Sequence, residues 1–122
     1  MKKLIKNELF LLGTKGGPAI RPKGSMPSSS LLVLDNEKIV IDAGLGVTKS
    51  LTDVGFNLNE LSNIFITHLH SDHYLELGSL IHTAWTTGLT EKIKIYGPKG
   101  LADYWKKFLF TTRGKKKTLI LI

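Results

Sequence analysis

The sequence contains no cysteine, and this absence restricts the chemistry that the protein can use. Disulfide bridges and thiolate metal ligands are excluded, so any bound metal must be held by imidazole or carboxylate groups. Long apolar runs are also missing, since none approaches the roughly 20 residues that a membrane-spanning helix needs. The sequence therefore predicts a soluble protein with no membrane partner, and the lack of cysteine suits a reducing, cytoplasmic location.

Acidic residues are scarce relative to basic ones, at 10 against 17, which gives a formal net charge of +7. Such a charge favours a polyanionic partner such as RNA. The lysines are spread along the whole chain, however, and a solvated surface explains scattered lysines better than a binding patch does. RNA therefore stays one alternative among the partners.

The pattern of apolar residues predicts one α/β domain, because strands alternate with helices and the apolar fraction of 42% suits a globular core. A Gly, Pro and Ser-rich segment at 13–30 reads as a long loop, of the kind that is usually functional or disordered. Strands are predicted at 9–12, 31–34, 39–41, 63–67 and 93–96, the second and third forming a hairpin. Helices are predicted within 47–57, 74–88 and 101–108.

Three of the four histidines and one aspartate lie within six consecutive positions after the predicted strand 63–67. These residues are His68, His70, Asp72 and His73. A strand that feeds an irregular loop lets such neighbours turn toward one point, which a continuous strand or helix does not allow at this spacing. A single histidine is more often a hydrogen-bonded packing residue, but three beside an aspartate indicate a metal site. His82, alone on a predicted helix, is left outside the site.

Imidazole and carboxylate ligands suit Zn2+, with iron or manganese as alternatives. Four such ligands are more than one ion with an open coordination position usually takes, so the cluster is compatible with two neighbouring metals. A pair of metals about 3.5–4 Å apart can generate hydroxide from water at neutral pH and stabilise the oxyanion that forms on attack. The cluster therefore points to metal-dependent hydrolysis.

The segment THLHSDH, from Thr67 to His73, resembles the HxHxDH signature of the metallo-β-lactamase superfamily. FLLGTKGGP is similar to the opening strand and Gly-Thr loop of the ribonuclease Z and arylsulfatase-like branch, and IVIDAG resembles a strand ending in a motif aspartate, here Asp42. Arg21 and the serines 28–30 lie where that branch has an arginine and a serine segment. LGSLIHTAWTTGL and IKIYGPKGL are similar to its next helix and strand, so the resemblance covers nearly all of residues 9–110.

The resemblance implies a role for each residue of the cluster. His68 and His70 would bind the first metal, and Asp72 and His73 the second. Asp42 would orient the histidine segment, with Thr67 supporting the ligands from beside them. The implied nucleophile is a metal-bridging hydroxide, with Asp72 as a catalytic residue and two Zn2+ ions in a complete site.

Members of this superfamily fold as a four-layer αββα sandwich and are about twice as long as this chain. The resemblance therefore implies that residues 1–110 form an N-terminal half, one mixed β-sheet with flanking helices. Residues 111–122 read as a basic and apolar tail unlike the family, for which we expect truncation or a frameshift near the lysines 115–117. The later ligand motifs have no counterpart, so we expect each metal to keep two ligands and the chain to be inactive without a second half or a homo-oligomeric partner.

Three functions follow from these patterns. The leading hypothesis is a metal-dependent hydrolase of phosphodiesters, sulfate esters or related esters. Within that class, the runner-up is a tRNA 3′-processing endonuclease of ribonuclease Z type. The rival is a non-catalytic metal-binding or interaction fragment, because a lone sheet would expose an apolar face.

Overall fold

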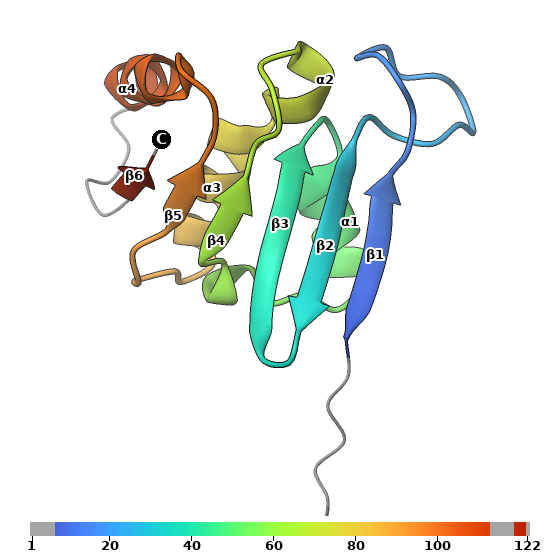
Figure 1. Cartoon of the computed structure of the whole chain (residues 1–122), viewed down its shortest axis with the longest axis horizontal. Helices are drawn as coiled ribbons and strands as arrows, with labels where there is room; N and C mark the ends of the chain where they lie inside the picture. The colour runs from blue at the N-terminus through green and yellow to red at the C-terminus, as the bar shows by residue number, and fades with distance from the viewer. Residues whose placement is uncertain (1–6, 113–118, 122) are drawn as a thin grey trace, which may run out of the picture.

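The computed structural model describes residues 7–112 and 119–121, and within them a mixed sheet of six strands is flanked by helices (Figure 1). The strands follow one another in the sheet as in the chain: β1 (Glu8–Gly13), β2 (Ser29–Leu34), β3 (Glu37–Ala43), β4 (Asn63–Phe65), β5 (Lys94–Tyr96) and β6 (Leu119–Leu121). The first three strands pair antiparallel, whereas β3, β4, β5 and β6 run parallel. This arrangement confirms the predicted α/β class.

The antiparallel part of the sheet is built around the predicted hairpin. A tight turn at Asp35 joins β2 to β3, and its φ of 54° is a left-handed conformation that aspartate tolerates. Leu31 of β2 pairs with Val40 of β3, and both side chains are buried. The alternation of buried and exposed residues along the two strands fixes their register, because a shift by one residue would turn the apolar side chains outward.

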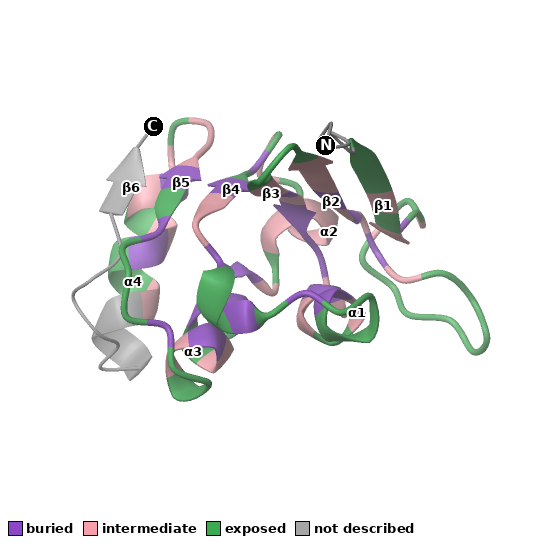
Figure 2. Cartoon of the chain, turned by 90° about the horizontal axis from the view of Figure 1, so that it is seen from below, coloured by how far each residue is buried: buried purple, intermediate pink, exposed green. Residues whose placement is uncertain are grey.

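Helices α1 (Val47–Asp53) and α3 (Leu77–Thr86) cover one face of the sheet, and α4 (Leu101–Thr112) lies beside α3 (Figure 2). A single 3-10 turn, η1 (Leu58–Glu60), leads into β4. The apolar positions that predicted α3, Leu77, Leu80 and Ile81, are all fully buried. Trp105 of α4 packs edge-on against Trp85 of α3, with ring centroids 6.1 Å apart. None of the helices within the described ranges is long and apolar enough to cross a membrane.

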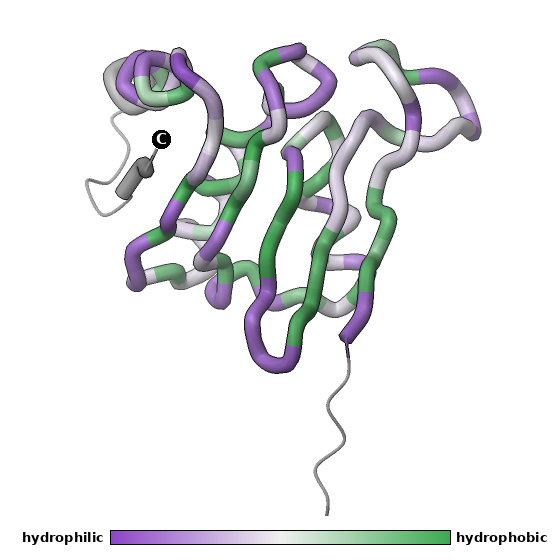
Figure 3. The backbone as a smooth tube through the Cα atoms, viewed as in Figure 1, coloured by the Kyte–Doolittle hydropathy of each residue, from purple (hydrophilic) through white to green (hydrophobic). Residues whose placement is uncertain are grey.

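The opposite face of the sheet carries no helix from the described part of the chain (Figure 2). Leu9 and Leu11 of β1 are 58% and 65% exposed, and Phe65 of β4 is 41% exposed. Phe65 stacks on Tyr96 of β5, with ring centroids 4.6 Å apart. Hydrophobic residues run along the neighbouring strands β1 to β4 (Figure 3). The sheet therefore exposes apolar side chains on this face, as the sequence predicted.

The parallel strands β3, β4 and β5 end at one edge of the sheet, and the short helix α2 (Ser71–Tyr74) lies just beyond that edge (Figure 1). The strand predicted at 63–67 ends at Phe65, because the backbone N–H of Thr67 bonds to a side chain instead of a neighbouring strand. Helix α4 continues through Thr112, so the boundary predicted after residue 110 falls inside a helix. The lysines 115–117 lie outside the described residues.

Candidate metal centre

The site is organised around Asp42, near the end of β3. Asp42 is only 4% exposed and has a φ of 63°, a left-handed conformation that aspartate adopts more readily than most residues. Its carboxylate accepts hydrogen bonds from the Thr67 backbone N–H at 2.7 Å, from the Thr67 hydroxyl at 2.9 and 3.0 Å, and from Nδ1 of His73 at 2.7 Å. Asp42 therefore ties both the segment after β4 and helix α2 to the end of β3.

These hydrogen bonds determine which nitrogen of each neutral imidazole carries the proton. An ionised Asp42 can only accept, so His73 donates its Nδ1–H. The hydroxyl hydrogen of Thr67 is directed at Asp42, so His68, whose Nδ1 lies 3.0 Å from the Thr67 oxygen, donates to that oxygen. When these rings are neutral, such hydrogen bonds leave Nε2 of each with its lone pair, which is the state that metal binding requires.

The predicted ligands lie together at the edge of the sheet. The ring centroid of His68 is 4.0 Å from that of His73 and 4.6 Å from that of His70. Nε2 of His73 lies 3.4 Å from a carboxylate oxygen of Asp72. Among the described residues, no three His, Asp or Glu side chains converge closely enough to define a preformed ion site. The structure thus gathers the predicted ligands in pairs, without forming a complete cage.

Asp72 lies on α2 and receives a hydrogen bond from the long β1–β2 loop. The backbone N–H of Gly17 donates to its carboxylate at 2.9 Å, and the φ of 81° at Gly17 is one that favours glycine. Burial alone would raise the pKa of Asp72, but the hydrogen bond from Gly17, together with the neighbouring imidazole of His73 when that ring is protonated, outweighs burial and lowers that pKa. Asp72 therefore carries a negative charge at neutral pH.

The loop predicted at 13–30 folds back on itself and packs against the site. Lys15 N–H donates to the carbonyl of Met26 at 3.0 Å, and Gly44 N–H donates to the carbonyl of Ser28 at 3.0 Å. A Cβ added at Gly44 would lie 2.4 Å from the carbonyl oxygen of Asp72. A glycine is needed at this position because the end of β3 and helix α2 approach backbone to backbone.

The donor set fits the metals that the sequence predicted. Two imidazoles have their Nε2 lone pairs left free by hydrogen bonds at Nδ1, and the neighbouring carboxylate is ionised. Nitrogen and oxygen donors of this kind suit Zn2+, and also iron or manganese. The observed residues therefore fit a divalent metal in chemical type.

The sequence predicted that the whole cluster lies on an irregular loop, and this prediction is wrong for its second half, which is helical. His68 and His70 precede α2, whereas Asp72 and His73 lie on it. The turn becomes helical because the carbonyls of His70 and Ser71 accept hydrogen bonds from the N–H groups of His73 and Leu75, at 2.9 and 3.0 Å.

Residues that the sequence left outside the site, or did not mention, can also be placed. His82 is exposed on α3, with its ring centroid 6.4 Å from that of Trp85. Arg21 is exposed in the long loop, whereas Ser29 is buried. Two contacts had no direct signal in the sequence: the hydrogen bond from Gly17 to Asp72, and those from Gly46 and Thr48 to Glu76. The only signal for either was indirect: glycines in the loop, and a carboxylate three residues after His73.

The sheet, its helices and the cluster at the edge of the sheet define the metallo-β-lactamase fold. The short form of human tRNase Z matches with a TM-score of 0.79 and 28% identity, covering 92% of this chain and 42% of that one. The metallo-β-lactamase fold protein YhfI from Bacillus subtilis matches with a TM-score of 0.72 and 21% identity, covering 93% and 44%. The predicted fold is thus confirmed, and this chain corresponds to less than half of each neighbour.

Within this fold, the chain belongs to the family described as anti-Pycsar protein Apyc1, whose profile matches residues 7–119. Ribonuclease Z from Clostridium botulinum (strain Alaska E43 / Type E3) is 36% identical over 96 residues, which are 79% of this chain and 30% of that protein. Ribonuclease Z from Pyrococcus furiosus is 34% identical over 102 residues, or 84% and 33%. The chain spans about a third of the length of the curated relatives it matches. The predicted resemblance to ribonuclease Z is confirmed, and the arylsulfatase part stays a prediction.

Proposed function

We propose that this chain contributes the metal-binding part of a phosphodiesterase, a nuclease of ribonuclease Z type. The observation that supports the proposal best is the cluster of His68, His70, Asp72 and His73, with Asp42 and Thr67 holding two of the imidazoles in the tautomer that can bind metal. The similarity to ribonuclease Z and tRNase Z favours a nuclease over other hydrolases of this fold.

The proposed metals are two Zn2+ ions, with iron or manganese as alternatives. His68 and His70 would hold one, and Asp72 and His73 the other. Bound there, such ions would activate water and stabilise negative charge on the phosphoryl oxygen. The protein's own contribution is to fix the rings: Asp42 orients His73 directly and His68 through the Thr67 hydroxyl.

Two protein ligands for each ion leave the centre incomplete. Catalytic zinc usually has three protein ligands and one open position, so the proposal requires further ligands from outside the described residues. A second half of the fold, or a second copy of this chain, would supply them. We therefore expect little or no activity from the 122-residue chain alone, and we propose a cytoplasmic location.

A phosphodiester in RNA is the proposed substrate class, ahead of sulfate and other esters. The loop at 14–28, which bonds to Asp72 through Gly17, contains three basic residues and no acidic one. Two of the three, Arg21 and Lys23, are exposed. Positive charge on this loop would attract a phosphate backbone. Processing of the tRNA 3′ end is the narrower alternative, supported by the similarity to human tRNase Z.

Metal content of the purified chain tests the proposal most directly. The chain is loaded with zinc or manganese, desalted, and measured by elemental analysis as the wild type, as His70→Ala and as His82→Ala. His82 is the matched control, because it is an exposed histidine on α3. We expect one or two equivalents of metal in the wild type and in His82→Ala, and at least one equivalent fewer in His70→Ala. Equal metal in all three proteins would mean that the cluster is not the binding site.

A second candidate function, a non-catalytic metal-binding or interaction module, is favoured by the exposed apolar face around Leu9, Leu11 and Phe65. Hydrolysis of bis(p-nitrophenyl) phosphate and of a short RNA separates the two. Weak turnover that falls to background in His70→Ala would support the nuclease. Metal bound at the cluster without any turnover, at high protein concentration, would favour the interaction module instead.

A further inference from the structure

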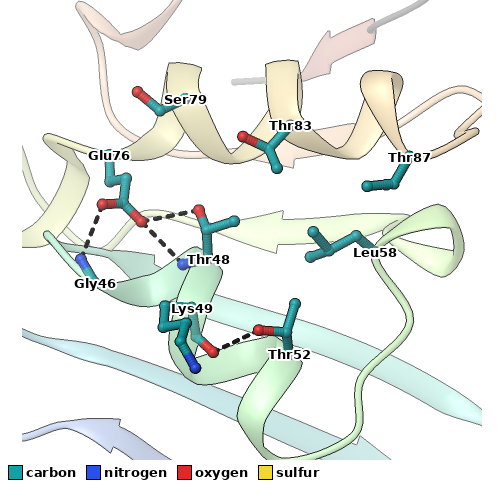
Figure 4. A pocket seen from close by; sticks show the side chains of 9 residues that line it. All are labelled: Gly46, Thr48, Lys49, Thr52, Leu58, Glu76, Ser79, Thr83 and Thr87. Carbon is teal, nitrogen blue, oxygen red and sulfur yellow. Dashed lines mark hydrogen bonds between the residues drawn. The ribbon is translucent and has the colours of Figure 1, made fainter.

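Glu76 lies in the two-residue connection between α2 and α3 and binds the start of α1 (Figure 4). One carboxylate oxygen accepts from the Gly46 N–H at 2.9 Å. The other accepts from the Thr48 N–H at 2.9 Å and from the Thr48 hydroxyl at 2.8 Å. The backbone N–H of Glu76 also donates to the carbonyl of Ala43 at 3.0 Å. Glu76 therefore bonds to the chain on both sides of the glycine turn that follows Asp42.

Helix α2 depends on such external bonds for its position. It has four residues and no side-chain N-cap hydrogen bond, and none of its residues is buried. Isolated helices shorter than about 12–15 residues are marginal in water, so α2 is held by contacts with other elements rather than by its own helix formation. Gly17 binds Asp72 at the start of α2, Asp42 binds His73 within it, and Glu76 is the second residue after its end.

Two consecutive residues of β3, Asp42 and Ala43, form hydrogen bonds to His73 and to Glu76. Asp42 binds the imidazole of His73, and the next residue, Ala43, accepts from the backbone of Glu76. Beyond them, Gly44 approaches the Asp72 carbonyl so closely that a Cβ would not fit. The carboxylate of Glu76 keeps this turn in place, because it binds the first N–H groups of α1, which has neither a side-chain cap of its own nor an acidic residue in its first turn.

We infer that Glu76 is a positioning residue of the metal centre. By locking the glycine turn and α1 against α2, it keeps His73 bonded to Asp42, with Nε2 beside Asp72. The identity of the ligand, a divalent metal, rests on the proposed function. The orientation of His73 does not, since it can be observed in the metal-free protein.

The test compares Glu76→Gln, which keeps the size of the side chain, with two control variants on α1. Asp53→Asn makes the same change of charge in a carboxylate that pairs with Lys49 and is exposed. Val47→Ala removes buried methyl groups from the first turn of α1 without touching the bonds to Glu76. Long-range 1H–15N NMR of the imidazoles reports the His73 tautomer without metal, and zinc titration by calorimetry reports affinity.

We expect His73 to show a fixed Nδ1–H tautomer in the wild type and in both controls, and averaged tautomers in Glu76→Gln. Zinc affinity should fall about ten- to a hundredfold in Glu76→Gln, as is usual when a residue that supports a ligand is lost. The inference is overturned if Glu76→Gln keeps both properties, or if Val47→Ala loses them to the same extent at a similar melting temperature. In either case Glu76 would only cap α1. Failure of the wild type to bind zinc would instead count against the proposed function, and the tautomer measurement would still decide the role of Glu76.

Discussion

Replacing Asp42 by asparagine perturbs the centre of the site with almost no change in shape. Asparagine tolerates the left-handed φ of 63°, and its oxygen can still accept from the fixed backbone N–H of Thr67. Its amide nitrogen cannot accept from His73, so Nδ1 of His73 must become the acceptor and the proton moves to Nε2. The nitrogen proposed to bind metal then carries a hydrogen.

Asp42→Asn should reduce zinc affinity strongly but the free energy of unfolding only moderately. Asp42→Asn exchanges a charge-assisted hydrogen bond, which contributes roughly 1.5–3 kcal/mol, for a neutral one, so the free energy of unfolding should fall by about 1–2 kcal/mol. Zinc affinity should fall about ten- to a hundredfold because the tautomer is wrong. Asp42→Ala leaves the N–H groups of Thr67 and His73 without their acceptor and puts a Cβ without a polar side chain at positive φ, so it should cost about 3–4 kcal/mol.

Urea denaturation measures the change in unfolding free energy, calorimetric titration measures zinc binding, and imidazole NMR measures the tautomer of His73. Asp42→Ala serves as the comparison for Asp42→Asn, because only Asp42→Asn should lose zinc affinity without a large loss of stability. If Asp42→Asn switches the tautomer but binds zinc like the wild type, His73 is not a ligand through Nε2. If the tautomer does not switch, the assigned hydrogen-bond directions are wrong.

Two further predictions concern the packing around the site. Gly44→Ala should lower the unfolding free energy by about 1–3 kcal/mol in urea denaturation, because its Cβ would lie within 2.9 Å of three neighbouring atoms. Gly16→Ala, which has nothing within 4 Å of its Cβ, should change stability little, and equal effects of the two would refute the contact. Burial raises the pKa of the Tyr104 phenol, although the hydrogen bond from the Gly78 N–H lowers it. The neutral phenol therefore stabilises the fold fully below about pH 10, the ordinary pKa of tyrosine. This contribution is lost as the pH rises through the pKa of the folded state. Tyr104→Phe should cost about 1–2 kcal/mol at pH 7 and flatten that loss at high pH, and an unchanged pH dependence of the melting temperature would contradict the assignment.

The sequence predicted those parts of the fold that depend on local patterns. Two β-rich runs joined by the turn-like residues 35–37 predicted the β2–β3 hairpin, and helical spacing from Leu77 to Trp85 predicted α3. The clustering of three histidines and an aspartate identified candidate ligands, because such a density of ligand-type side chains is uncommon in a packing role. In the structure His68 lies beside His70 and His73, and His73 beside Asp72, but within the described ranges no three of these side chains converge on one point.

The contacts that hold the ligands in place could not be predicted in the same way. Gly17 and Asp72 are 55 residues apart, and Glu76 meets Gly46 and Thr48 across 30 and 28 residues. No periodic sequence pattern predicts these contacts, because they depend on how β3 ends and on the path of the long loop. The short helix α2 was not predicted either, because it has no buried residue and hence no apolar pattern in the sequence.

The position of β4 connects the exposed face of the sheet with the metal centre. Phe65 lies on the exposed face and stacks on Tyr96, while Thr67, two residues later, binds Asp42. Between them, Ile66 is buried, so the backbone here has little freedom to separate the two features. A partner sheet packed on this face would lie about 10 Å away. If the partner that supplies the missing ligands also covers this face, completing the fold and completing the set of metal ligands would be a single event.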